Sequence, residues 1–178
     1  FGFSISENNW LGKGNRLKFE LDVDEESLGG VLNYSNPNYN FLGNSINYFI
    51  SSESNDKPDQ GYENAVYSAG IATGFEQYKD VFFNLGISAT FDDLRTQDSA
   101  SASLKKQSGE FAEIAGNYSF TFDNRNRSFM PTSGSISSFN QVLPIYADRP
   151  FIENTLSHSN YKSFSDENII SASKFYIS

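Results

Sequence analysis

The chain has 178 residues with a formal net charge of −9, no cysteine and a single histidine, His158. Its length fits one domain, the lack of cysteine excludes disulfides and cysteine metal sites, and one imidazole leaves no cluster for zinc, copper or iron. The acidic balance disfavours nucleic acid, because binding a polyanion needs a concentrated basic surface.

Membrane crossing by helices is not predicted. No stretch approaches the roughly 20 apolar residues of a membrane helix, and the mean hydropathy of −0.49 is typical of proteins in water. This average does not exclude a membrane β-barrel, because the strands of a barrel alternate apolar and polar residues. The sequence begins at Phe1 without an initiator methionine or signal peptide, so we expect the true N-terminus to lie upstream.

Ten strands are predicted, in chain order, at residues 1–8, 16–23, 28–34, 44–52, 62–75, 81–91, 112–122, 134–144, 153–164 and 168–178. The clearest covers 16–23, where every odd position is apolar and every even position is charged. Phe82 is the exception to the alternation in 81–91. The residues that we expect to face lipid are Leu17, Phe19, Leu21, Val23, Phe83, Leu85, Ile87, Ile114, Tyr118 and Phe120.

No helix is predicted between these strands, so each is expected to pair with its neighbour in an antiparallel meander. The connections at 53–61 and 93–109 are long, charged and rich in serine. Shorter ones lie at 9–14, 75–80 and 165–167; a short connection at 24–26 and a long one at 123–134 break the alternation. Outer-membrane barrels place long loops outside the cell and tight turns in the periplasm.

A soluble β-sandwich shows the same alternation, so only the positions of the charged and aromatic residues can distinguish it from a barrel. A charge facing lipid near the midplane costs about 2–4 kcal/mol, and the well-aligned strands place every charge on one side. Their apolar faces end in aromatics, among them Tyr34, Phe91 and Phe122, as in barrel girdles. These features favour an all-β, antiparallel up-and-down transmembrane β-barrel, with the sandwich left open as an alternative.

Catalytic and metal-binding patterns are missing from the sequence. A lone His158 in a segment rich in serine and asparagine indicates an exposed or lumen residue. The acidic pairs Glu25-Glu26 and Asp92-Asp93 have no EF-hand spacing and are interpreted as solvated charges. We therefore expect no enzyme, no metal site and no cofactor.

Three turn sequences occur in an order that resembles one family of outer-membrane barrels. The first is 8–14, with Trp10, Leu11, Gly12 and Gly14; the second begins at Asn36-Pro37; the third is 127–135, with Arg127, Pro131, Thr132 and Gly134. Together they resemble the BamA-like outer-membrane protein assembly factors of the bacterial surface antigen superfamily, which includes mitochondrial and chloroplast import barrels. Asn38 stands where the family usually has an aromatic residue.

The resemblance implies a sixteen-stranded barrel in the bacterial outer membrane, of which residues 1–178 would form about ten strands, the second through the eleventh. It also implies a function, the folding and insertion of other β-barrels. The implied partners are outer-membrane lipid, unfolded β-barrel clients and accessory lipoproteins bound through periplasmic domains. The family's POTRA repeats, first strand, C-terminal strands and Val-Arg-Gly-Phe loop are absent from these residues.

The turn residues have physical roles that we can predict. Gly12 and Gly14 would permit positive φ in a tight turn, Trp10 would anchor at the membrane interface, and Pro131 would end strand pairing. Arg127 is expected to bind inside the lumen. A TamA-like or two-partner-secretion transport barrel, a passive porin and a soluble β-sandwich binding module remain as alternative functions.

Overall fold

The computed structural model describes residues 1–164 and 169–178. The strands are β1 (Gly2–Trp10), β2 (Asn15–Val23), β3 (Ser27–Asn36), β4 (Ser45–Lys57), β5 (Tyr62–Tyr78), β6 (Val81–Thr96), β7 (Gly109–Asp123), β8 (Ser133–Ala147), β9 (Glu153–Phe164) and β10 (Ile169–Ile177). The prediction of ten strands is confirmed. The expected 165–167 connection lies outside the described residues.

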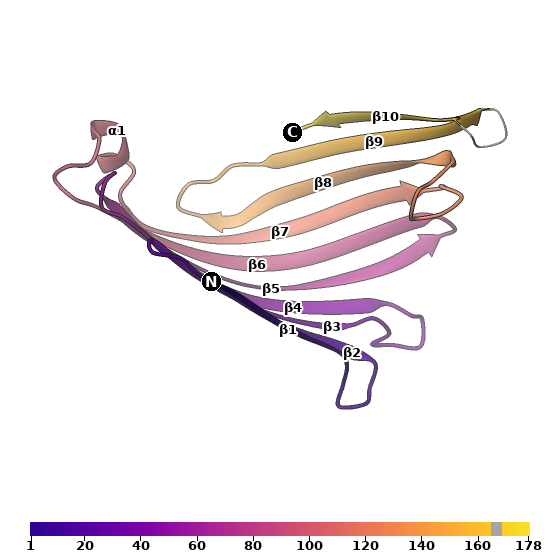
Figure 1. Cartoon of the computed structure of the whole chain (residues 1–178), viewed down its shortest axis with the longest axis horizontal. Coiled ribbons are helices and arrows are strands. Elements are labelled where there is room, and N and C mark those ends of the chain that lie inside the picture. Colours follow the sequence, from indigo (N-terminus) through magenta and orange to yellow (C-terminus); the bar gives the residue numbers. More distant parts are fainter. Residues whose placement is uncertain (165–168) are drawn as a thin grey trace.

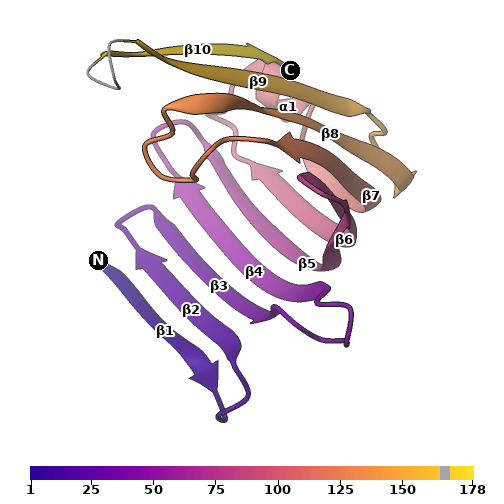
Figure 2. The same ribbon diagram turned by 90° about the vertical axis from the view of Figure 1, so that its right-hand side faces the viewer.

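All ten strands form one antiparallel sheet in the order of the sequence, from β1 to β10. The sheet curls, so that β5–β7 form the back of an open trough and β1 and β10 are its two edge strands (Figures 1 and 2). Outer-membrane barrels consist of antiparallel strands that pair with their neighbours in sequence through turns and loops. A curled meander of this kind therefore has the form of a section of barrel wall.

A second layer does not cover this sheet in the described part of the chain. The only buried hydrophobic residues there are Ala100 and Ala115, whereas large apolar side chains such as Ile50 and Ile87 are exposed. A soluble sandwich buries its apolar faces between two sheets. The sandwich alternative is therefore excluded.

The central strands are longer than predicted. β5 and β6 have 17 and 16 residues, and β4 continues to Lys57. The predicted long connection at 53–61 is therefore wrong: Glu53 pairs with Val66 and Lys57 with Tyr62, which leaves a turn at 58–61. The segment read as a loop because polar strand ends that project beyond the apolar band resemble one in composition.

The connections fall into two groups at opposite ends of the sheet (Figure 1). One end carries the connections at 11–14, 37–44, 79–80 and 124–132, and we call it the turn end. The other carries those at 24–26, 58–61, 97–108 and 148–152, and we call it the loop end. The turn end contains the three family motifs and the predicted short connections at 9–14 and 75–80.

One short helical turn, α1 (Ala102–Lys105), interrupts the longest connection at the loop end, where no helix was predicted. Its N-terminal cap is Ser101, whose Oγ accepts a hydrogen bond from the Leu104 amide at 3.2 Å. Within the described residues, no helix is long and apolar enough to cross a membrane.

Candidate functional site

The strand register settles which side chains share a face. Leu17 is opposite Tyr34, Tyr34 is opposite Tyr48, and the row continues through Ile71 to Ile87. Paired residues point to the same side of a sheet. By this rule the ten residues predicted to face lipid, from Leu17 to Phe120, all lie on one face, which we call the outer face.

The outer face of the central strands is an uncharged band with aromatic borders. On β6 the band runs from Phe83 to Phe91, about 27 Å at roughly 3.4 Å per residue. A strand tilt of about 40° reduces this to about 21 Å in height, close to the roughly 25 Å apolar band of outer-membrane barrels. At the turn-end border Phe83 packs between Phe75 and Phe120, with ring centroids 5.7 and 5.3 Å away.

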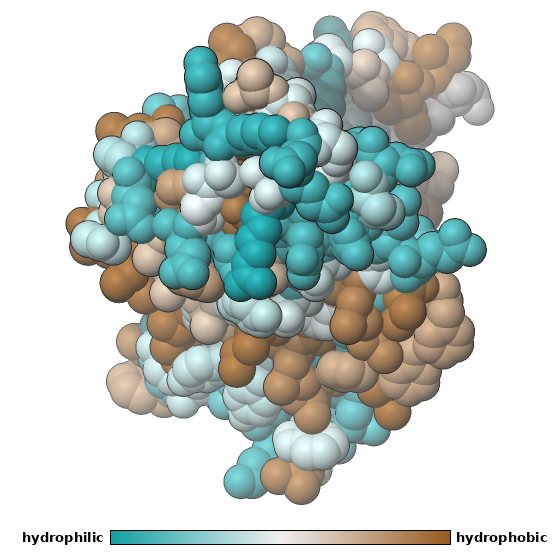
Figure 3. Space-filling view, turned by 90° about the vertical axis from the view of Figure 1, so that its left-hand side faces the viewer, coloured by the Kyte–Doolittle hydropathy of each residue, from teal (hydrophilic) through white to brown (hydrophobic). Residues whose placement is uncertain are grey.

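Charges appear on the outer face of these strands only beyond the band, toward the loop end. Arg95 and Asp93 form an ion pair of 2.6 Å there, and Glu63 is opposite Arg95. The hydrophilic surface at this end is visible in Figure 3. This distribution is the one that the cost of burying charge in lipid requires.

The outer face changes character at β8–β10, where the sequence could not assign sides. Register places Phe139 and Leu156 on it, but also His158 and Lys162. The Ser137 hydroxyl and His158 Nδ1 form a hydrogen bond of 2.8 Å across the strands. This part of the wall therefore offers polar groups where β2–β7 offer apolar ones.

The opposite, inner face is lined with short polar side chains. Cross-strand hydrogen bonds connect Ser68 to Thr90 at 3.1 Å, Asn117 to Ser88 at 3.1 Å, and Ser138 to Ser157 at 2.7 Å. These bonds satisfy the polar groups between strands, and on β2 the same face carries an ion pair of 2.7 Å between Lys18 and Glu20.

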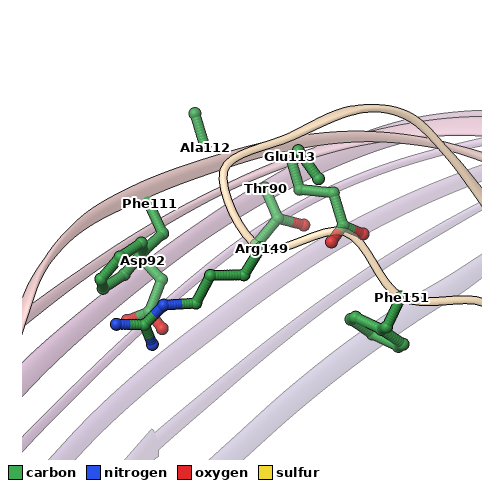
Figure 4. A pocket seen from close by; sticks show the side chains of 8 residues that line it. Thr90, Asp92, Phe111, Ala112, Glu113, Arg149 and Phe151 are labelled. Atoms are coloured by element: carbon green, nitrogen blue, oxygen red, sulfur yellow. The ribbon is translucent and has the colours of Figure 1, made fainter. Parts of the chain in front are cut away.

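A hollow of about 440 Å³ lies on the inner face near the loop end, where the β8–β9 connection folds over β6 and β7 (Figure 4). The Arg149 guanidinium stacks 3.4 Å from the centre of the Phe111 ring and donates to the Gln107 carbonyl at 2.9 Å. The Asp148 carboxylate accepts a hydrogen bond of 2.7 Å from the Ala112 amide. The sequence offered no signal for this contact, since Asp148 and Arg149 occupy an irregular segment.

Asp92 lines the same hollow, and its buried Oδ1 has no hydrogen-bond partner. In residues 1–164 and 169–178, this hollow included, no group of three or more acidic or histidine side chains has the geometry to hold a metal ion. The acidic pair at 92–93 is split by the sheet, because Asp92 points inward and Asp93 outward.

The β1–β2 turn has the backbone that its glycines predict. Gly12 and Gly14 have φ of +70° and +72°, and Leu11 has φ of +55°. The Asn9 side chain accepts a hydrogen bond of 2.7 Å from the Gly14 amide. Trp10 ends β1 opposite Asn15, at the turn end of the sheet. Its role as an interface anchor stays a prediction.

In the β3–β4 connection, Asn36 is the last residue of β3, and its side chain accepts a hydrogen bond of 3.0 Å from the Asn38 amide across Pro37. The sequence motif thus corresponds to an Asn-initiated turn.

The β7–β8 connection is the most highly organised part of the turn end. Thr132 is 1% exposed, and Asn126 binds its amide and hydroxyl at 3.1 and 2.8 Å. Gly134 has φ of +93°, and a Cβ there would collide with the backbone of Asn124. Pairing of β8 begins at Ser133, two residues after Pro131.

Two arginines belong to this connection. Arg125 donates two hydrogen bonds to the Asp123 carboxylate, at 2.8 and 2.7 Å. These hydrogen bonds raise the pKa of the Arg125 guanidinium above its ordinary value. Arg127 Nε donates to the Met130 carbonyl at 2.7 Å, within the connection itself. A role for Arg127 inside the lumen stays a prediction.

Neighbour-paired strands, an uncharged outer band with aromatic borders and a polar inner face define the wall of a bacterial outer-membrane β-barrel. The chain belongs to the Omp85 superfamily, since the model of the Omp85 superfamily domain matches residues 9–176. This places it among the outer-membrane barrels of the Omp85 superfamily.

The solved structure of BamA from Haemophilus ducreyi lacking POTRA domains 1–3 is similar to this chain, with a TM-score of 0.78 and 22% sequence identity. The match covers 97% of this chain and 36% of the BamA chain. The likeness shows the fold, and the prediction of a BamA-like barrel section is confirmed.

Proposed function

We propose that the protein containing this chain folds other β-barrel proteins and inserts them into the outer membrane. The observation that carries the proposal is the placement of the three BamA-like turn motifs, in order, on one end of a sheet that matches a BamA barrel over 97% of its length. Within the superfamily, the segment Trp10-Leu11-Gly12 favours a BamA-like protein over the transport branches.

In this function residues 1–178 supply wall. Their inner face keeps the lumen polar, their outer band holds the barrel in lipid, and their turn end faces the periplasm. Barrel-assembling proteins act through a weak seam between first and last strands, which can pair with the edge strand of a client. We place that seam, the POTRA repeats and the lipoprotein contacts in other parts of the protein.

The proposed clients are unfolded β-barrel proteins, and the action is non-enzymatic and independent of a cofactor. Binding energy from strand pairing and from apolar burial in lipid can drive insertion without a covalent step. Asn38 departs from the aromatic residue usual after Pro37, and the TamA-like and two-partner-secretion branches are the alternatives that this departure leaves open.

Depletion of the protein in its own cells tests the proposal. We expect the folded amounts of many unrelated outer-membrane barrels to fall together, measured by quantitative proteomics and by heat-modifiable gel migration. Re-expression of the intact gene should restore them. A change in permeability with normal barrel levels would contradict the proposal and indicate a porin, and loss of one secreted substrate alone would indicate a transporter.

A further inference from the structure

The turn end displays large apolar side chains on three of its four described connections between β1 and β8. Leu11 is 74% exposed, Phe41 96%, and Phe129 80%, and Tyr78 at the end of β5 is exposed as well. At the loop end, the β8–β9 connection alone among those described shows this feature, at Phe151 and Ile152. A gathering of large apolar groups at one end of a molecule marks a site that contacts a membrane or another protein.

The charges of the two ends are opposite in sign. The described turn-end connections carry four basic residues, Lys13, Lys79, Arg125 and Arg127, against one acid, Asp80. The loop-end connections carry three basic residues against six acidic ones. The connection at 165–168 has the acidic sequence Asp166-Glu167, so this basic apolar rim belongs to β1–β8. In a chain of net charge −9, a basic end is a local feature.

The β7–β8 connection at the turn end is held at its base by side-chain hydrogen bonds. The bonds of Asn126 to Thr132 and of Arg125 to Asp123 lie at the base of the β7–β8 connection, from which Phe129 and Met130 project as exposed side chains. Met130 has φ of +48°, and its carbonyl accepts the Arg127 Nε bond. Lys162 lies beside this base, opposite Ser133.

We propose that this rim binds the headgroups of anionic phospholipids in the periplasmic leaflet, with Phe41 and Phe129 inserted between them. Aromatic and basic side chains at the end of a membrane-spanning element fit that zone, because the rings lie at the headgroup level and the cations meet phosphate. The proposal rests on the barrel's place in the outer membrane and does not depend on its action on clients.

The test uses the intact protein in lipid vesicles, with a cysteine for an environment-sensitive dye. The described chain has no cysteine of its own, so labels at Phe41→Cys and Phe129→Cys are compared with Gln60→Cys at the loop end. We expect blue-shifted emission and quenching by headgroup-proximal spin labels at positions 41 and 129, and neither at 60. Water-like emission at 41 and 129 would show that lipid does not cover these positions and would overturn the proposal.

Lipid preference is measured with the dye at 129, by comparing quenching from spin-labelled phosphatidylglycerol and phosphatidylcholine at equal amounts. We expect phosphatidylglycerol to quench at least about twofold more strongly, and the preference to weaken in high salt. Arg127→Gln should abolish it, Arg127→Lys should keep it, and Lys106→Gln at the loop end should leave it unchanged. Equal loss in the glutamine and lysine variants at 127, or no preference in the parent, would overturn the proposal.

Client insertion is measured separately in the same vesicles. Absence of a lipid preference in the parent protein with normal insertion would refute only this inference, whereas normal lipid contacts with no insertion would refute only the proposed function.

Discussion

Ile87 and Asn140 lie on opposite faces of the same sheet, and the medium on each face determines which substitutions each position tolerates. Ile87 lies in the middle of the outer band and is opposite Ile71, while Asn140 is on the inner face opposite Ser119. Both side chains are exposed, so packing contributes little to the difference between them. The solvent on each face, lipid or water, decides the effect of a charge.

We therefore expect Ile87→Lys to lower the free energy of unfolding by about 2–4 kcal/mol in lipid, and Asn140→Lys to change it by less than about 1 kcal/mol. Urea titrations of the protein in vesicles, followed by heat-modifiable migration, measure both values. Equal effects of the two substitutions would show that the outer band does not face lipid.

The β8–β9 connection illustrates how a short irregular element is fixed by few contacts. Arg149 reaches the Phe111 ring and the Gln107 carbonyl, which ties two loop-end connections together. A stacked cation contributes about 0.5–1 kcal/mol at an exposed site. The element should therefore open locally long before the sheet unfolds.

Arg149→Ala should raise the amide exchange of residues 148–152 and of 107–108 several-fold while leaving β6 and β7 unchanged. Hydrogen exchange with mass spectrometry measures this in detergent or vesicles. Arg95→Ala removes the exposed ion pair with Asp93 and serves as the control, with no change expected at 148–152. An unchanged exchange rate in Arg149→Ala would mean that the Asp148 bond to Ala112 holds the connection alone.

Period-two patterns predicted the strands well where one face is apolar and the other charged, as in residues 16–23. They failed at the ends of β4–β6, because strand extensions beyond the membrane carry polar residues on both sides and read as loop. They also left β8–β10 without assigned faces, since Ser137, His158 and Lys162 share a face with Phe139. The turn motifs were visible in the sequence, but Arg149 over Phe111 depends on the curl of the sheet.

At the scale of the molecule, the sheet has two edge strands, β1 and β10, whose outward backbone groups pair with nothing in the described residues. Exposed edge strands invite pairing with other chains. We expect residues 1–178 produced alone in detergent to associate in a concentration-dependent way, as measured by analytical ultracentrifugation. Ser4→Lys with Ser6→Lys on β1 should reduce the association, whereas a monomer at all concentrations would contradict edge pairing.

Because each strand touches only the strands beside it in sequence, the wall can be divided at any hairpin. The entropic cost of loop closure is then that of one connection at each step, and the chain can assemble progressively from either edge of the sheet. Gain or loss of one hairpin would alter the circumference without disturbing distant contacts. Such a wall can change its size by whole hairpins over evolutionary time while its face pattern and its turns are kept.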